Sequence, residues 1–233
     1  MKHKKRVLKI ALAIIFVFYC LFIYRDMHHT SGFFPTYILK YISILFCFFI
    51  TLMIGKDSIH KRDRTLLQFG MLCTVFADFF FLILNHYIVG IGFFCLVQII
   101  YYFRYKGRII PSILFRFLLG FLLIIGIHLL LNLLEVKVEW ILTMASFYAL
   151  CIITSVIESI HVLKVNGYPA INRWLIVLGM VLFLLCDINV ALSYLMKSYA
   201  IELYGTSATL IWIFYLPSQV FLSLSGYRLN RIK

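Results

Sequence analysis

Long apolar runs alternate with short polar connections along the whole chain, which is the pattern of a multi-pass membrane protein. Each run is long enough to cross a hydrocarbon layer of roughly 30 Å as a helix. The eight predicted spans cover residues 7–24, 34–54, 65–85, 88–104, 109–132, 139–162, 173–196 and 205–226. Because the connections are short, we expect one polytopic membrane domain over residues 1–233, with no separate soluble domain.

Composition supports the membrane assignment. Of the 233 residues, 64% are hydrophobic and 13% are charged, whereas soluble domains average about 45–50% apolar and about 25% charged residues. Five basic residues follow Met1 and precede the first run, as in a signal peptide, but no small-x-small cleavage site follows Tyr24. An uncleaved first helix is therefore expected.

The distribution of basic residues predicts the orientation. Eighteen Lys and Arg residues fall at the two ends of the chain and in the 2–3, 4–5 and 6–7 connections, and four fall on the opposite side. The positive-inside rule then predicts that both termini are cytoplasmic. The net charge of +13 lies next to membrane headgroups, and no nucleic-acid-binding motif accompanies it, so no nucleic-acid partner is expected.

Two acidic residues, Asp78 and Asp187, lie deep inside predicted spans. An ionised carboxylate in hydrocarbon is costly unless it faces a partner or a cavity, so intramembrane acids usually mark functional sites. Arg64 and Arg173 precede them by 14 positions each, which places each acid about 21 Å from its basic residue along a helix. Both acids are therefore expected at the same depth, in the outer half of the membrane.

The surroundings of the two acids are repeated in the sequence. Gly70-Met71 precedes Asp78 by eight positions, and Gly179-Met180 precedes Asp187 by eight. Both segments run outward from the cytoplasm, so the repeat is parallel. The sequence thus predicts an all-α bundle of eight transmembrane helices, with two parallel four-helix repeats as a possible arrangement.

A second group of polar residues is predicted to surround the acids. Lys40 enters span 2 from the outer side, where its ammonium could pair with a carboxylate or bind an anionic headgroup. Gln98 and Tyr101 belong to span 4, and Tyr148 to the outer half of span 6. Each of these residues is a candidate for substrate binding, although amides and Lys also serve as interhelical hydrogen-bonding groups or snorkel to the interface.

Span 8 also carries polar residues on one face. Tyr215 and Gln219 are one helical turn apart, and both are candidates for substrate binding. Pro217 lies between them and must leave a backbone carbonyl without its helical partner, as in helices that line a cavity.

No metal site or cofactor site is expected. His128 stands alone in span 5, and the six cysteines lie within spans without a CxxC spacing, so packing roles are favoured over zinc ligation. Motifs of serine hydrolases, nucleotide-binding loops and zinc proteases do not occur.

The motifs around the acids resemble the YhhN, lysoplasmalogenase-like, family of membrane proteins. The resemblance covers roughly residues 34–226 in the right order. It is carried by residues 70–78, residues 90–101, residues 179–187, the Tyr-x-x-x-Gln element at 214–219, and Lys40. It implies an eight-helix protein, expected in the inner membrane of a bacterial cell.

The resemblance also implies an activity. Members of the family hydrolyse the vinyl-ether bond of lysoplasmalogens to a fatty aldehyde and a glycerophospho-headgroup compound, with Asp78 and Asp187 as the catalytic acids here. Two positions depart from the family pattern, because Gln98 replaces a His and Cys186 replaces a Ser. Gln neither titrates nor carries charge, so function could differ while the fold is retained.

Two carboxyl groups suit this chemistry independently of the resemblance. A vinyl ether is cleaved by protonation of its carbon, and water then captures the resulting oxocarbenium ion. One protonated acid and one carboxylate can divide these tasks. Two alternatives remain open: a small-molecule or lipid transporter using the same acids, and a catalytically altered relative that only binds lipid. The oligomeric state is left open.

Overall fold

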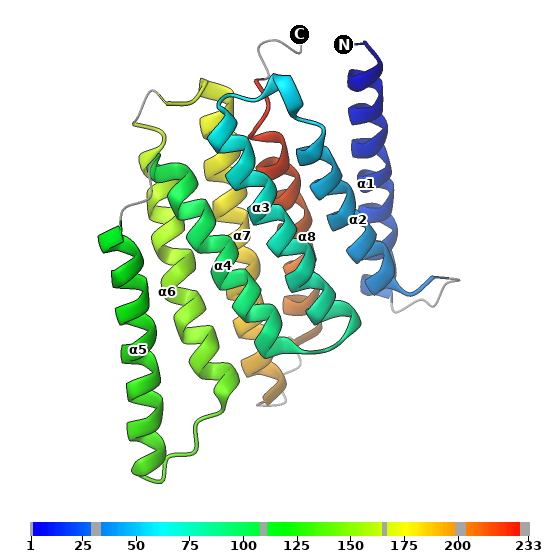
Figure 1. Cartoon of the computed structure of the whole chain (residues 1–233). Helices are drawn as coiled ribbons and strands as arrows, with labels where there is room; N and C mark the ends of the chain where they lie inside the picture. The colour runs from blue at the N-terminus through cyan, green and yellow to red at the C-terminus, as the bar shows by residue number, and fades with distance from the viewer. Residues whose placement is uncertain (1, 29–33, 108–110, 165–166, 199–203, 229–233) are drawn as a thin grey trace.

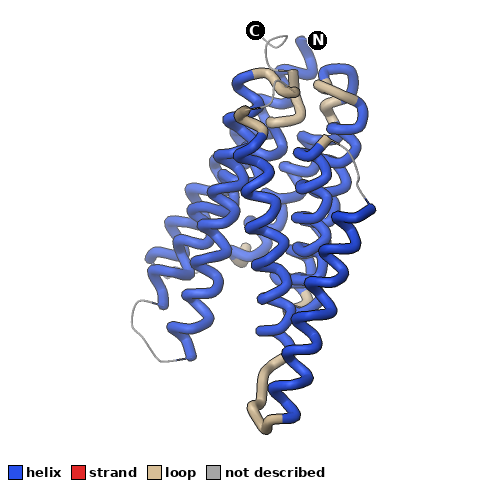
Figure 2. Tube along the Cα trace, turned by 90° about the vertical axis from the view of Figure 1, so that its left-hand side faces the viewer, coloured by secondary structure: helices blue, strands red, loops and turns tan. Residues whose placement is uncertain are grey.

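The chain folds as an all-helical bundle in the computed structural model, which describes residues 2–28, 34–107, 111–164, 167–198 and 204–228. Figure 2 shows helices and loops, without strands, over this part of the chain. The α-helices there are α1 (Lys2–His28), α2 (Thr36–Leu52), α3 (Lys61–Asp78), α4 (Tyr87–Lys106), α5 (Pro111–Leu133), α6 (Trp140–His161), α7 (Ala170–Ser198) and α8 (Tyr204–Leu224). The predicted all-α class is confirmed.

The number of membrane-spanning helices differs slightly from the prediction. Seven of the described helices are long and apolar enough to cross a membrane, whereas α2 has only 17 residues and is shorter than the others. Pro35 precedes α2, and after Leu52 the chain turns into a short 3-10 helix, Gly55–Asp57, so α2 cannot extend in either direction. The predicted start of span 5 at residue 109 lies outside the described residues.

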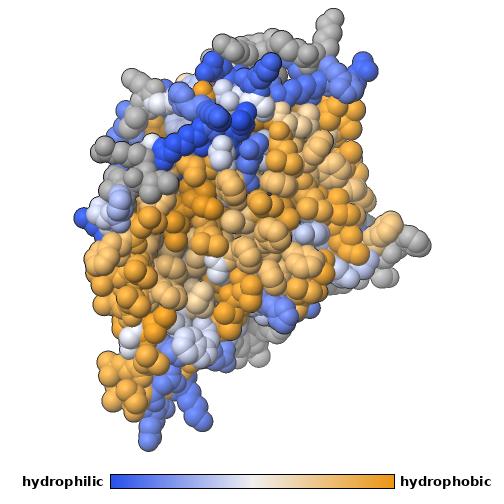
Figure 3. Space-filling view, in the orientation of Figure 1, coloured by the Kyte–Doolittle hydropathy of each residue, from blue (hydrophilic) through white to orange (hydrophobic). Residues whose placement is uncertain are grey.

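Helix α1 begins and helix α8 ends at the same end of the bundle, which we call the inner end, and the opposite end is called the outer end (Figure 1). An apolar belt separates hydrophilic surfaces at the two ends (Figure 3). At the inner end, Lys4 of α1 pairs with Asp57, whose carbonyl accepts a hydrogen bond from the Arg228 N–H at 2.8 Å. That this end faces the cytoplasm stays a prediction from the basic residues.

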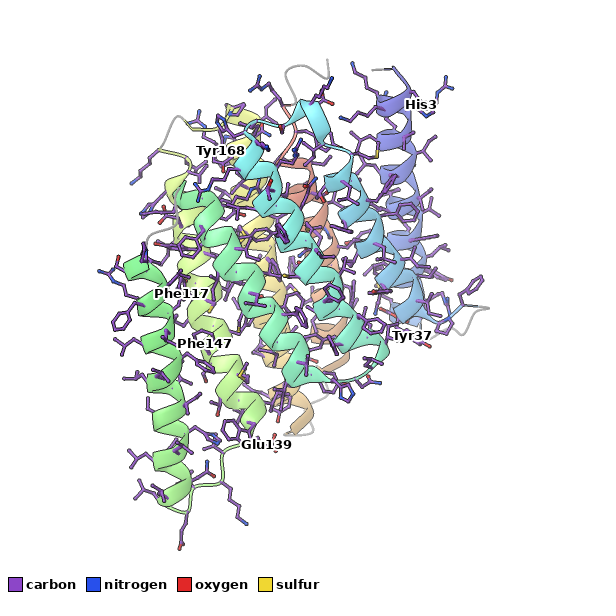
Figure 4. All side chains as sticks on the ribbon, viewed as in Figure 1. His3, Tyr37, Phe117, Glu139, Phe147 and Tyr168 are labelled. Carbon is purple, nitrogen blue, oxygen red and sulfur yellow. The ribbon has the colours of Figure 1, made fainter. Side chains whose placement is uncertain are left out.

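The helices that carry the two acids each pack along the helix that follows them. α3 lies against α4, α7 lies against α8, and α4 also packs against α6. α5 lies at the edge of the bundle, where Phe117 and Phe147 lie between α5 and α6 (Figure 4) and the rings of Phe121 and Phe147 are 4.9 Å apart. The parallel four-helix repeat stays a prediction.

Gly70 and Gly179 permit the close approach of these paired helices. A Cβ atom added at Gly70 would lie 2.4 Å from Cε1 of Tyr101 in α4, and one added at Gly179 would lie 2.8 Å from Cγ of Leu222 in α8. Tyr101 and Leu222 are fully buried, so neither side chain can move aside without disturbing the core. The two glycines therefore serve the same packing role in the two hairpins.

We expect Gly70→Ala to destabilise the protein, because the added methyl group overlaps the buried Tyr101 ring. Overpacking of this kind costs about 1–3 kcal/mol, and thermal unfolding in detergent should show a lower midpoint. Gly92→Ala in α4 is the matched control, since a Cβ there meets nothing within 4 Å. Equal midpoints for the two variants would contradict the packing role of Gly70.

Candidate active site

Asp78 is buried at the end of α3 and is bonded to a tyrosine from the last helix. Only 4% of Asp78 is exposed, and the Tyr215 hydroxyl of α8 donates to its Oδ2 at 2.7 Å. The helix widens into a π-helical turn, Phe79–Ile83, directly after this residue. Such turns are rare and often occur at functional sites. The apolar span therefore changes its geometry next to its intramembrane acid.

Asp187 has a tyrosine partner from a different helix. The Tyr148 hydroxyl of α6 donates to Asp187 Oδ2 at 2.6 Å. Gln98 Nε2 of α4 donates to the Tyr148 oxygen at 3.4 Å, and Ser155 Oγ donates to Gln98 Oε1 at 2.6 Å. A chain of neutral side chains thus fixes the orientation of Tyr148 toward the carboxylate.

Two phenylalanines join the Asp–Tyr pairs into one cluster. The Phe94 ring lies 6.1 Å from the Tyr148 ring and 6.2 Å from the Tyr215 ring, and Phe183 lies 5.7 Å from Tyr215. Both acids therefore border the same aromatic interior, in the outer half of the bundle.

The two pairs differ in their exposure. Asp78 and Tyr215 are buried, whereas Asp187 and Tyr148 are both half-buried. The pair on α6 and α7 is thus more exposed than the pair on α3 and α8.

Lys40 reaches this cluster only indirectly. Its ammonium pairs with the carboxylate of Asp26 in α1 at 2.7 Å and lies 4.9 Å from the centre of the Trp212 ring. Trp212 in turn contacts Tyr215, with 5.2 Å between the ring centres. Lys40 does pair with a carboxylate, as the sequence allowed, but that carboxylate belongs to neither intramembrane acid.

Pro217 leaves a backbone carbonyl without its helical partner, as predicted, and another helix supplies a hydrogen-bond donor for it. Proline at position 217 cannot donate to the carbonyl of Ile213, four residues earlier. The Tyr19 hydroxyl of α1 donates to this carbonyl at 3.2 Å. The sequence analysis did not single out Tyr19, because nothing in the local pattern shows that α1 passes α8 at this level.

Gln219 and Tyr101 lie closer to the inner end than the acids do. Both are fully buried, and the polar atoms of the Gln219 amide and the Tyr101 hydroxyl make no hydrogen bond within the described part of the chain. The structure therefore brings the Asp78–Tyr215 pair together with the hydrogen-bonded chain of Asp187, Tyr148 and Gln98. Tyr101 and Gln219 lie one or two helical turns away from them.

A second polar cluster lies at the inner end, and the sequence analysis missed it. Arg104 of α4 forms a two-point ion pair with Asp63 of α3, with Nε–Oδ1 at 2.7 Å and Nη2–Oδ2 at 3.2 Å. The Tyr168 hydroxyl, from the loop before α7, donates to Asp63 Oδ1 at 2.7 Å; Figure 4 labels this residue at the inner end. The sequence did contain a signal for this pair, because Asp63 and Arg104 carry opposite charges at neighbouring ends of two consecutive spans.

We expect Asp63→Asn to destabilise the protein strongly, because it leaves the Arg104 guanidinium buried without its counter-charge. Removing one partner of a buried ion pair costs about 3–5 kcal/mol. Asp57→Asn is the matched control: its pair with Lys4 is partly exposed, and such pairs contribute only about 0–1 kcal/mol. Chemical unfolding in detergent measures the free energy of unfolding of both variants. Similar losses of this free energy would show that the Asp63–Arg104 pair is not a buried one.

Tyr168 makes the stability of the inner end sensitive to alkaline pH. Burial, followed by the charge of Asp63, raises the pKa of Tyr168 above its ordinary value of 10.0. Its contribution to stability is therefore complete below pH 10 and is lost as pH rises further, because the unfolded chain then ionises first. Above pH 10, the free energy of unfolding should fall less steeply with pH for Tyr168→Phe than for Tyr37→Phe, the control at an exposed site. Equal slopes of unfolding free energy against pH for the two variants would refute this role of Tyr168.

The described residues contain no group of three or more His, Cys, Asp and Glu side chains that could hold a metal ion. His128 is buried beside Thr143, whose Oγ1 lies 2.7 Å from Nδ1, and its ring packs on Trp140. It joins α5 to α6 as a packing residue.

The fold and the paired acids define a multi-pass integral membrane protein with a polar site inside its helix bundle. The model of the YhhN family matches residues 35–226 of the chain. The protein belongs to the YhhN family, which includes lysoplasmalogenases. Searches of curated proteins and of solved structures returned no match.

Proposed function

We propose that the protein is a membrane hydrolase that cleaves the vinyl-ether bond of lysoplasmalogens, in the inner membrane of a bacterial cell. The observation that carries the proposal is the pair of intramembrane carboxyl groups, each bonded to a tyrosine and both bordering one aromatic cluster. Family membership supports the same activity. Asp78 and Asp187 are the proposed catalytic residues.

The proposed reaction needs one acid and one carboxylate. The acid transfers its proton to the outer carbon of the vinyl ether, and the double-bond electrons form the new C–H bond, which leaves an oxocarbenium ion. The carboxylate removes a proton from water as the water oxygen bonds to the cationic carbon. As the resulting hemiacetal breaks its C–O bond to the glycerol oxygen, the carboxyl group that took the proton from water gives it to that oxygen. The hemiacetal hydroxyl gives its own proton to the other carboxylate, so both groups return to their starting states. One water is consumed, and an aldehyde and an alcohol are released.

The exposure of the site favours entry of a lipid between α6 and α7. Asp187 and Tyr148 are half-buried there, while Asp78 and Tyr215 are enclosed. A hydrocarbon chain can approach through the apolar belt without leaving the bilayer, and the polar headgroup stays near the outer end. Phe94 and Phe183 provide an apolar wall for the alkenyl chain.

The other predicted site residues take supporting roles in this proposal. Tyr148, held by Gln98, and Tyr215 orient the two carboxyl groups. Lys40, paired with Asp26, lies over the Trp212 ring, where another of its three ammonium hydrogens can bind a phosphate oxygen of the headgroup.

We expect purified protein in nanodiscs to release a fatty aldehyde from a 1-alkenyl lysophospholipid. Asp78→Asn and Asp187→Asn should each lower kcat/KM by about a hundredfold or more, because each removes one of the two proton-transfer groups. Asp57→Asn, far from the cluster, should retain activity. The matched 1-alkyl lysophospholipid should not react, since a saturated ether has no carbon that can accept the proton.

The result also separates the alternatives. Saturable lipid binding without turnover would favour the catalytically altered, lipid-binding relative. Uptake driven by an ion gradient in proteoliposomes, lost in both Asp variants, would favour a transporter. Full activity of either Asp→Asn variant would show that the pair does not catalyse the reaction.

A further inference from the structure

A line of buried polar atoms that have no hydrogen-bond partner among the described residues runs from the inner end toward the acids. The atoms are Arg104 Nη1, Tyr105 Oη, Tyr101 Oη, and Nε2 and Oε1 of Gln219. The exposed fraction is 2% for Arg104, 7% for Tyr105, and 0% for Tyr101 and Gln219. Buried polar groups in proteins almost always bond to protein or to ordered water, and an unmet bond costs about 1–3 kcal/mol.

Helix geometry shows that these atoms succeed one another in depth. The rings of Phe94 and Tyr215 are in contact, and α4 and α8 both run from the outer to the inner end (Figure 1). Gln219 follows Tyr215 by four residues, and Tyr101 follows Phe94 by seven, which places them about 6 Å and about 10 Å inward of that contact.

Tyr105 continues the line on the same face of α4, one turn beyond Tyr101. The two rings are 6.0 Å apart, and Arg104 Cζ lies 5.6 Å from the Tyr105 ring. The other guanidinium nitrogens of Arg104 are taken by Asp63. Nη1 of Arg104 and the hydroxyl of the neighbouring Tyr105 are thus a donor and a hydroxyl at the beginning of the line.

We propose that this line is a column of bound water that enters at Arg104 and Tyr105 and ends at Gln219, next to the Tyr215–Asp78 pair. A buried water needs two or more polar partners. Tyr105 with Arg104 provides one such position, and the Gln219 amide, with a donor and an acceptor of its own, provides a deeper one. Water is the ligand that fits, because the two positions combine donors with acceptors and only one of the groups, the Arg104 guanidinium, is charged and already paired.

The column deepens the proposed function and rests on it for its role. Hydrolysis consumes one water per turnover, and a site within the apolar belt has no bulk water beside it. Since the column arrives at the Tyr215 side, it delivers water to Asp78. Asp78 is then the carboxylate that activates water, and Asp187, on the side where lipid enters, is the proton donor.

Hydroxyl-radical footprinting by X-rays tests the column without any substrate, because radicals formed from bound water modify the side chains beside it. We expect Tyr101 and Tyr105 in substrate-free nanodiscs to be modified at least tenfold faster than Tyr227. Tyr227 is the matched control, since it is equally buried but its hydroxyl donates to the Ile50 carbonyl at 2.7 Å. Modification of Tyr101 and Tyr105 no faster than that of Tyr227 would overturn the proposal.

Two substitutions locate the deeper water. Gln219→Leu should lower the modification of Tyr101 at least fivefold and leave Tyr105 unchanged. Gln68→Leu is its control, because the Gln68 amide already donates to the Thr51 carbonyl at 3.0 Å, and it should change neither rate. An unchanged Tyr101 rate in Gln219→Leu would overturn the assignment of this amide to the column.

The catalytic role has a separate readout. In an active preparation, Gln219→Leu should lower kcat for aldehyde release about tenfold with little change in KM, because water supply and not lipid binding is affected. A raised KM with unchanged kcat would assign Gln219 to the lipid and overturn its role in water delivery. Positive footprinting without hydrolysis of any ether lipid would refute the proposed function and leave the water column standing.

Discussion

The need to satisfy two carboxyl groups inside an apolar bundle determines which helices must meet. Tyr215 lies 137 residues from Asp78, and Tyr148 lies 39 residues from Asp187. Each hydrogen bond therefore fixes the rotation of two helices about their axes, because a small turn of either helix would move the hydroxyl out of reach. Burial of an unpaired acid would cost several kcal/mol, so these contacts constrain the bundle more strongly than any one apolar contact.

The same requirement explains the polar pairs away from the acids. The carbonyl released by Pro217 accepts from Tyr19, and the Arg104 guanidinium pairs with Asp63. In a soluble protein, water would satisfy some of these groups. Here other helices supply the partners, and so α1, the helix nearest the N-terminus, is held against the last helix by a hydrogen bond as well as by apolar packing.

Sequence reasoning predicted the parts of the structure that depend on one helix at a time. Apolar runs gave the helices to within a few residues, and the cost of charge in hydrocarbon singled out Asp78 and Asp187 before any contact was known. Partners across helices could not be predicted in the same way. Nothing in the periodicity of α2 shows that Lys40 faces Asp26, because helix neighbours follow from three-dimensional packing and not from spacing along the chain.

Gln98 holds the Asp187 side of the cluster through both ends of its amide. Its amide accepts from Ser155 and donates to Tyr148, so it uses both polar ends to hold the tyrosine that bonds Asp187. An amide can fix geometry in this way, but it cannot take up or release a proton near neutral pH. Any proton transfer on this side of the cluster must therefore pass between Asp187, Tyr148 and the bound molecule. Gln98 thus orients Tyr148 toward Asp187 and leaves any exchange of protons near neutral pH to the carboxyl group.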